Sequence, residues 1–164
     1  MFSTRLASPC DIPLIRELND KVWPQTYAPI LSPEQIGYML EMMYSENSLL
    51  QQMQEGCTFL IVYHDQEPVG FASFQEIEKT IYKLHKIYVL TSEQGKGTGR
   101  FLLEDILDRI RKKNGTKIRL QVNRYNTAKK FYEKLGFSVI GQADFDIGNG
   151  FFMNDYIMEK RLVP

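Results

Sequence analysis

The sequence of 164 residues predicts a mixed α/β (α+β) fold that forms a single domain over residues 1–164. Three observations support this prediction. Apolar residues recur at helical spacing in the first third of the chain, β-rich segments occupy its middle and its end, and a strand, a glycine-rich turn and a helix follow one another in residues 87–110. A chain of this length buries enough surface to fold without disulfides or metal ions.

The composition argues against several classes of protein. Twenty basic and twenty acidic side chains give a formal charge of zero, which removes the electrostatic basis for binding nucleic acid. The apolar runs are too short to span a bilayer, and the first residues lack the organisation of a signal peptide. Cys10 and Cys57 form neither a disulfide framework nor a zinc-binding pattern. We therefore expect a cytoplasmic protein with no nucleic-acid partner, no membrane partner and no metal.

The N-terminal third is predicted to be mainly helical after a short strand at residues 2–7. A first helix begins near Asp11 and ends at Pro24, because proline lacks a backbone donor and clashes with the preceding turn. The prolines from Pro24 to Pro33 indicate a semi-rigid loop. A second helix then continues to Gly56.

Three strands are predicted in the middle of the chain. The apolar run Cys57–Tyr63 and the extended pattern Val69–Ile77 lie on either side of a turn sequence, so we expect them to form a hairpin. The segment Lys79–Leu90 is again β-like and leads directly into the glycine-rich turn.

The second half of the chain predicts helix, strand, helix and two final strands. The helix after the glycine turn has one apolar stripe and ends at Asn114. Lys117–Asn123 alternates between apolar and polar residues, as a half-buried strand does, and the next helix ends at Gly136. The last two strands are Phe137–Ile147 and Phe151–Lys160.

The glycine-rich turn is typical of a phosphate-binding site. Its residues are Gln94, Gly95, Lys96, Gly97, Thr98, Gly99 and Arg100. Backbone N–H groups at the start of a helix lack partners within the helix, and glycines let a phosphate approach them closely. The pattern matches neither a Walker A loop nor the Gly-x-Gly-x-x-Gly dinucleotide fingerprint. The alternative is a turn that only joins a strand to a helix.

Two motifs together resemble the GNAT superfamily of N-acetyltransferases. They are Gln-x-x-Gly-x-Gly after Ile87-Tyr88-Val89, and Asn126-x-Ala128 followed by the segment Phe131–Phe137. The resemblance implies a GNAT-like fold with a central, mostly antiparallel mixed sheet of about seven strands, splayed in the middle and flanked by about four helices. It also implies acetyl-CoA as the acyl donor, and no metal.

The resemblance assigns cofactor contacts to particular residues. The backbone of Ile87, Tyr88 and Val89 is expected to pair with the pantetheine arm. The turn from Gln94 to Arg100 is expected to bind the pyrophosphate, and Asn126 and Lys129 to contact the cofactor from the other side. Short strings around Trp23, Tyr27 and Asp155 resemble the bacterial spermidine and spermine acetyltransferase branch, which implies that these residues bind a cationic amine.

Transfer of an acetyl group needs an acid for the leaving thiolate and a base for the amine. The resemblance assigns the acid role to Tyr132, whose phenol stays protonated at neutral pH. Glu76 and His85 are the candidate bases, since both lie on strands expected near the acceptor. The alternatives are that Tyr132 packs in the core, that Glu76 lies on a solvated strand face, and that His85 is simply a polar strand residue.

The predicted function is therefore transfer of an acetyl group from acetyl-CoA to a primary amine of a small molecule, polyamine-like or otherwise cationic. The alternatives are a non-catalytic acyl-CoA sensor and an enzyme that acetylates a protein or peptide amine. A homodimer is also expected, because the C-terminal hairpin offers edge strands for pairing. Neither motif identifies the acceptor.

Overall fold

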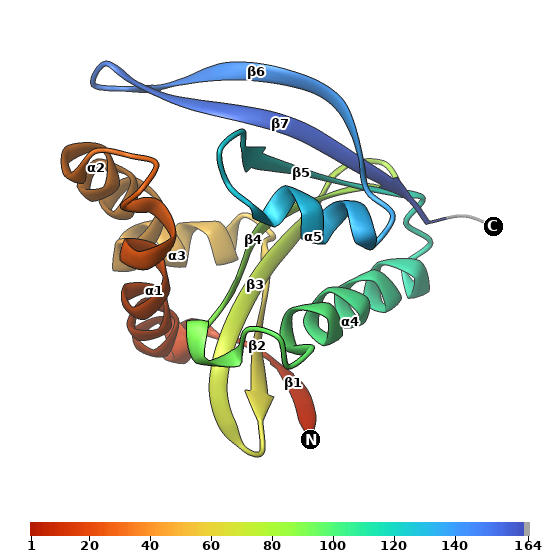
Figure 1. Cartoon of the computed structure of the whole chain (residues 1–164). Helices are drawn as coiled ribbons and strands as arrows, with labels where there is room; N and C mark the ends of the chain where they lie inside the picture. Colours follow the sequence, from red (N-terminus) through yellow and green to blue (C-terminus); the bar gives the residue numbers. More distant parts are fainter. Residues whose placement is uncertain (163–164) are drawn as a thin grey trace.

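The computed structural model describes residues 1–162, in which one seven-stranded sheet carries helices on both faces (Figure 1). The strands are β1 (Phe2–Leu6), β2 (Thr58–His64), β3 (Glu67–Glu78), β4 (Ile81–Val89), β5 (Lys117–Asn123), β6 (Ser138–Gly148) and β7 (Phe151–Arg161). The helices are α1 (Ile12–Tyr27), α2 (Pro33–Tyr44), α3 (Glu46–Gln54), α4 (Thr98–Lys112) and α5 (Ala128–Lys134), and short 3-10 turns occupy Pro9–Asp11 and Thr91–Glu93. Within residues 1–162, none of the helices has the length and apolarity needed to cross a bilayer.

The strands follow the order β1-β2-β3-β4-β5-β7-β6 across the sheet. All neighbours are antiparallel except β4 and β5, which run parallel. This mixed, mostly antiparallel sheet confirms the predicted fold class. The predicted hairpins are β2–β3 and β6–β7.

Each face of the sheet has its own apolar core. On one face α4 and α5 pack through residues such as Leu102 and Ile106, which are fully buried. On the other face α1, α2 and α3 pack through residues such as Ile15 and Leu49 (Figure 1). The apolar stripe predicted for the helix after the glycine turn is the buried face of α4.

Helix α1 is longer than predicted, because Pro24 lies inside its last turn instead of ending it. A proline removes a single helical hydrogen bond, and the next turn closes through the N–H of Ala28, which donates to the Pro24 carbonyl at 3.0 Å. The rings of Trp23 and Tyr27 also lie 4.4 Å apart across this turn. The extension places Tyr27 on a helix and not in a loop.

The helix predicted to run to Gly56 is two helices, α2 and α3, that meet at Ser45. The backbone of Ser45 is extended, with a ψ of 155°. Its hydroxyl accepts the N–H of Ser48 at 3.2 Å and so caps α3. This serine cap explains why the chain turns although the apolar spacing continues.

A β-bulge at His85 changes which side chains of β4 face each core. Ser73 pairs with Lys86 and Phe74 pairs with Leu84, which leaves His85 as an extra residue. Before the bulge, Leu84 packs with α4 and α5; after it, Tyr88 packs with α1 to α3. The bulge therefore inverts the alternation of the strand.

Candidate functional site

The two parallel strands at the centre of the sheet separate part of the way along their length. Residues 81–84 of β4 pair with residues 117–120 of β5. Beyond them, residues 86–89 of β4 pair only with β3, and residues 121–123 of β5 pair only with β7. The separation begins at the His85 bulge, because a bulge interrupts the ladder and increases the local twist. The splayed sheet that the family resemblance implied is thus present.

The glycine turn lies after β4 and leads into α4. Gly95 and Gly97 have φ values of 78° and 84°, in the left-handed region, and Gly97 is the N-cap of α4. A Cβ on either glycine would meet no atom within 4 Å, so the turn needs glycine for its backbone conformation and not for space. Open amides at a helix start fit a pyrophosphate.

Replacement of Gly97 by alanine tests this account of the turn. We expect a loss of about 1–2 kcal/mol in the free energy of unfolding, because alanine disfavours the left-handed region. Gly37 is the matched control, since it is exposed inside α2 and its Cβ would also meet nothing within 4 Å. Gly37→Ala is expected to stabilise the protein by about 0.5–1 kcal/mol. Urea unfolding of both variants measures the change in the free energy of unfolding. Changes of the same sign in the two variants would contradict the requirement for glycine at position 97.

A buried carboxylate beneath the turn holds it in place. Glu93 accepts hydrogen bonds from His64 Nδ1 at 2.7 Å, from the Thr98 hydroxyl at 3.0 Å and from Lys96 Nζ at 3.3 Å. The side chain of Glu93 is 7% exposed. The Thr98 hydroxyl therefore points inward, which leaves only its backbone for a ligand.

Glu93→Gln is expected to weaken donor binding without slowing the chemical step. The amide keeps the size of the side chain but removes the charge that holds Lys96 and Thr98, so the turn loses rigidity. We expect the KM for acetyl-CoA to rise about tenfold, while kcat changes little. Glu104→Gln is the control, because Glu104 is an exposed carboxylate on α4 that pairs with Arg100. A large fall in kcat with an unchanged KM would contradict the supporting role of Glu93.

The remaining cofactor candidates, Asn126 and Lys129, differ in the contacts that their polar atoms already make. Asn126 Oδ1 accepts the N–H of Ala128 at 2.9 Å, and the Asn126 side chain also hydrogen-bonds towards the Tyr27 phenol. Lys129 pairs with Glu133 at 3.5 Å and lies 5.3 Å from the Tyr156 ring centre. The arrangement leaves the backbone amides as the main anion donors.

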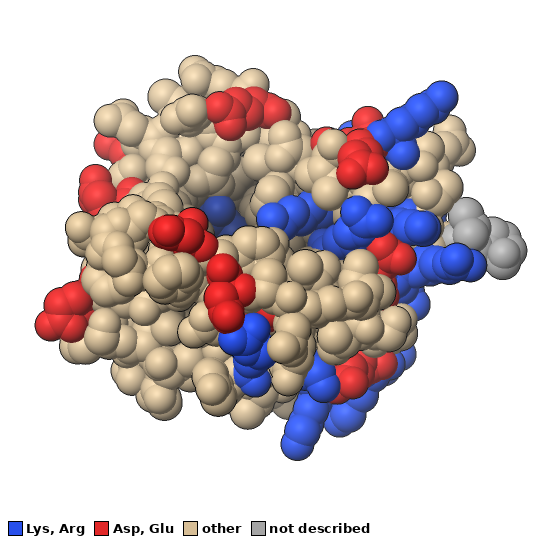
Figure 2. All heavy atoms as spheres, turned by 90° about the horizontal axis from the view of Figure 1, so that it is seen from above, with Lys and Arg blue, Asp and Glu red and all other residues tan. Residues whose placement is uncertain are grey.

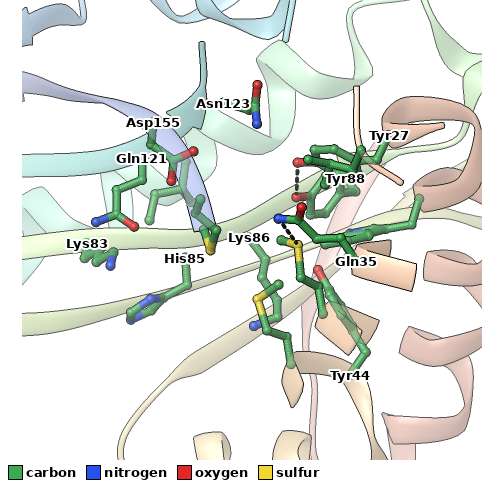
Figure 3. A pocket seen from close by; sticks show the side chains of 16 residues that line it. Tyr27, Gln35, Tyr44, Lys83, His85, Lys86, Tyr88, Gln121, Asn123 and Asp155 are labelled. Carbon is green, nitrogen blue, oxygen red and sulfur yellow. Dashed lines mark hydrogen bonds between the residues drawn. The ribbon is translucent and has the colours of Figure 1, made fainter. Parts of the chain in front are cut away.

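A pocket of about 160 Å³ opens on the α1–α3 side of the separation. Figure 2 shows a hollow on the face seen from above, with basic side chains along one side of it. Strand β4 forms the floor of the pocket, and β5, β7, α1 and α2 form its walls (Figure 3). Its lining residues include Gln35, Met39, Tyr44, Gln121, Asn123 and Met153.

Aromatic side chains from α1 and β4 form one wall of this pocket. The hydroxyls of Tyr27 and Tyr88 lie 2.9 Å apart (Figure 3). The ring of Trp23 packs against both, with its centre 4.4 Å from that of Tyr27 and 6.1 Å from that of Tyr88. Trp23 and Tyr27, two of the residues predicted to bind the acceptor, thus line the same pocket. The side chain of Tyr88 contributes to this pocket as well.

Tyr132 lies on α5, and its ring packs against Phe131 and Phe137. It is 8% exposed, and burial, followed by the nearby Tyr27 phenol, raises the pKa of Tyr132. The phenol therefore stays protonated across the physiological range. Tyr132 is thus a packed core residue, and its protonated phenol has the form that the predicted acid role requires.

Asp155 is the one carboxylate among the described residues that line the pocket. It is 3% exposed, and its Oδ2 has no hydrogen-bond partner within residues 1–162. Burial raises the pKa of Asp155 to about 6, although Arg124 and Lys83 act in the opposite direction. Asp155 pairs with Asn123 across β7 and β5, at the end where β5 leaves β4.

The two predicted bases have different positions. His85 lines the pocket, and its Nε2 lies 3.1 Å from Gln75 Oε1. Partial desolvation, followed by the charges of Lys83 and Lys86, lowers the pKa of His85 to about 4, so the ring is a weak base. Glu76 does not reach the pocket, because it is exposed near the β3–β4 turn and accepts the Thr80 N–H at 3.2 Å.

Sequence reasoning missed Lys83, Lys86 and Glu93. Lys83 and Lys86 lie on the pocket floor, and Glu93 lies beneath the turn. A signal for the first two was present, since the consecutive polar residues His85 and Lys86 break the alternation of the strand. Within residues 1–162, no group of three or more His, Cys, Asp or Glu side chains is placed to hold a metal ion.

The chain is similar to known acetyltransferases over most of its length. The family model described as "Acetyltransferase (GNAT) domain" matches residues 27–159. An N-acetyltransferase of Mycobacterium tuberculosis is 27% identical over 145 residues, which cover 87% of this chain and 92% of the relative. The PaiA N-acetyltransferase of Thermoplasma acidophilum, solved in complex with coenzyme A, is 29% identical with a TM-score of 0.82 and covers 98% and 99% of the two chains. A spermidine N-acetyltransferase chimera from Vibrio cholerae shares the fold, with a TM-score of 0.73 at 21% identity and coverage of 98% and 95%.

Proposed function

This chain belongs to the GNAT acetyltransferase family, and we propose that it transfers an acetyl group from acetyl-CoA to a primary amine of a small molecule by direct attack. One observation supports the choice of acceptor above all. The pocket draws its lining from both strands at the β4/β5 separation, so a concave space adjoins the place where the two strands part. A concave pocket lined by aromatic and polar side chains suits a small molecule better than a folded protein surface.

The donor fits the residues along the separation. The unpaired edge of β4 from Ile87 to Val89 offers backbone groups to the pantetheine arm, and the turn from Gly95 to Arg100 offers amides to the pyrophosphate. Asn126, at the start of α5, has an amide nitrogen with two hydrogens to donate, and its Oδ1 accepts the N–H of Ala128. When bound, acetyl-CoA supplies a thioester carbonyl as the electrophile. The residues of this chain orient the amine, exclude water and move protons.

We assign removal of the proton from the acceptor ammonium to Asp155. The ionised carboxylate attracts the ammonium and takes its proton, so that the amine nitrogen regains its lone pair. A pocket that lowers the pKa of Lys86 to about 8, mainly through burial, also lowers the pKa of a bound ammonium. The acceptor pKa then approaches that of Asp155, at about 6, and the transfer becomes less unfavourable.

Tyr132 supplies the second proton transfer. Attack forms a C–N bond and breaks the C–S bond, and the electron pair of that bond leaves on sulfur. The Tyr132 hydroxyl donates its proton to this sulfur, while the new amide nitrogen loses its remaining extra proton to solvent. The phenolate then recovers a proton from water, and Asp155 releases to solvent the proton that it took from the ammonium. The net products are an N-acetylated amine, CoA with a free thiol and one released proton.

The test of the acceptor class is release of CoA thiol from acetyl-CoA in the presence of separate panels of small amines and peptide amines. Acetylation of small amines, identified by mass spectrometry, supports the proposal. Acetylation confined to peptide amines would replace it with the protein-modifying alternative.

The homodimer stays a prediction. Strand β6 lies at the edge of the sheet, and Val139 and Ile140 on it are 41% and 53% exposed. These apolar side chains are compatible with pairing of two copies along that edge.

A further inference from the structure

We infer that the acceptor carries an acidic group, a carboxylate, in addition to the amine that receives the acetyl group. The inference rests on the proposed function and specifies its substrate class. It follows from the charges that line the pocket, where Lys83 and Lys86 lie opposite the single carboxylate of Asp155. In Figure 3, the lysines project from the floor strand β4 and Asp155 from β7 across the pocket.

The β4 bulge brings these basic side chains together. In a regular strand, Lys83 and Lys86 would face opposite sides of the sheet, because successive residues alternate. The extra residue at His85 shifts the alternation by one, so Lys86 faces the same side of the sheet as Lys83. Lys83, His85 and Lys86 all line the pocket. Two ammonium groups and a neutral imidazole thus share one floor.

Lys86 is a buried ammonium without an acidic partner. It is 8% exposed, and its Nζ donates to Gln52 Oε1 at 2.7 Å. The same nitrogen lies 5.1 Å from the ring centre of Tyr44 and 5.9 Å from that of Phe59. In the described chain, residues 1–162, no ion pair includes Lys83 or Lys86.

A buried ammonium costs free energy unless an anion compensates it. Burial lowers the pKa of Lys86 to about 8, so the side chain is still mostly protonated at neutral pH. A carboxylate on the acceptor would supply the missing anion. The amide of Gln52 and the two aromatic rings stabilise Lys86 only in part, since none of them carries a negative charge.

The same charges disfavour a polyamine. One ammonium of a polyamine would pair with Asp155, but its next ammonium would approach Lys83 or Lys86, and like charges repel strongly where solvent is excluded. A molecule with one amine and one carboxylate offers an opposite charge both to Asp155 and to the two lysines. Its amine faces Asp155 and its carboxylate faces the lysines, as in an amino acid.

The experiment compares pairs of acceptors that differ by one carboxylate. Lysine with cadaverine, ornithine with putrescine and histidine with histamine form such pairs, and thiol release gives kcat/KM for each member. We expect the carboxylated member to be favoured by at least about tenfold in at least one pair. Lys86→Met, which keeps the length of the side chain, is expected to reduce that ratio to about one. Lys113→Met is the control, because Lys113 is exposed at the end of α4, and it should leave the ratio unchanged.

The outcomes separate this inference from the proposed function. A preference for the carboxylated member below about tenfold in every pair, or a ratio that Lys86→Met does not change, overturns the inference and leaves small-amine acetylation intact. Thiol release at background with every small amine overturns the proposed function, and the inference with it. Lys83→Met provides a second test if Lys86→Met does not fold, since the same reduction in ratio is expected.

Discussion

Tyr132→Phe is expected to lower kcat about 10²- to 10⁴-fold, because it removes the proton donor for the departing sulfur. The ring of Tyr132 packs against Phe131 and Phe137, and phenylalanine preserves both contacts. The affinity for acetyl-CoA should therefore stay within about twofold, which calorimetric titration measures. Loss of turnover without loss of binding is the signature of an interaction made only in the transition state.

Tyr82→Phe is the matched control for this substitution. Tyr82 is a buried tyrosine of the same core, but it lies near the start of β4, where β4 still pairs with β5 and the strands have not separated. Its replacement should leave kcat unchanged. A Tyr132→Phe enzyme with wild-type kcat would remove Tyr132 from the acid role, and equal losses in both variants would indicate a general effect of altering this core.

Asp155→Asn is expected to lower kcat by a similar factor, about 10²- to 10⁴-fold, and to remove the acidic limb of the pH profile. Asp155 must be ionised to accept a proton, and its pKa is about 6. In the wild-type enzyme kcat/KM should therefore fall about tenfold for each pH unit below 6. The asparagine variant should show no such fall. An unchanged acidic limb in the variant would assign the base role to another group.

The same substitution should stabilise the protein at neutral pH. The pKa of Asp155 in the fold, about 6, exceeds its ordinary value of 3.8, mainly because the carboxyl is buried. The folded state therefore retains this proton to a higher pH than the unfolded chain does, and stability is lost as pH rises from about 4 to about 6. At pH 7 the difference corresponds to about 3 kcal/mol.

Asparagine carries no charge and avoids this cost. Urea unfolding should show that the advantage of Asp155→Asn is largest at pH 7 and shrinks as the pH falls towards 4. A variant that gains stability while it loses turnover would identify Asp155 as a residue kept for function at the expense of the fold. A difference in unfolding free energy that stays constant between pH 4 and pH 7 would contradict the raised pKa.

The sequence pattern predicted those features of the fold that depend on residues close together in the chain. The glycine turn is such a feature, since the left-handed φ values of Gly95 and Gly97 and the start of α4 follow from neighbouring residues. The alternation of β5 and the apolar stripe of α4 likewise predicted their buried faces. The helix that runs through Pro24 was mispredicted because the proline removes only one hydrogen bond and the following turn still closes through the N–H of Ala28.

The pocket could not be predicted in the same way, because it depends on contacts between distant segments. The buried state of Asp155 depends on the pairing of β7 with β5, and the environment of Lys86 depends on α2, α3 and the β4 bulge. His85 lies on the pocket floor, whereas Glu76 is exposed near the turn after β3 and lies outside the pocket. Glu93 gains its role only when His64 of β2 lies beside the turn.

The central claim is that this chain moves an acetyl group from acetyl-CoA to a small amine that occupies the pocket beside β4 and β7. The most direct measurement is the amount of N-acetylated small amine formed per CoA thiol released, in wild-type enzyme supplied with acetyl-CoA and a single accepted amine. We predict a ratio of about one and a rate that saturates with amine concentration. Measurable acetyl-CoA binding with thiol release that no small amine raises above background would contradict the claim and favour an acyl-CoA sensor.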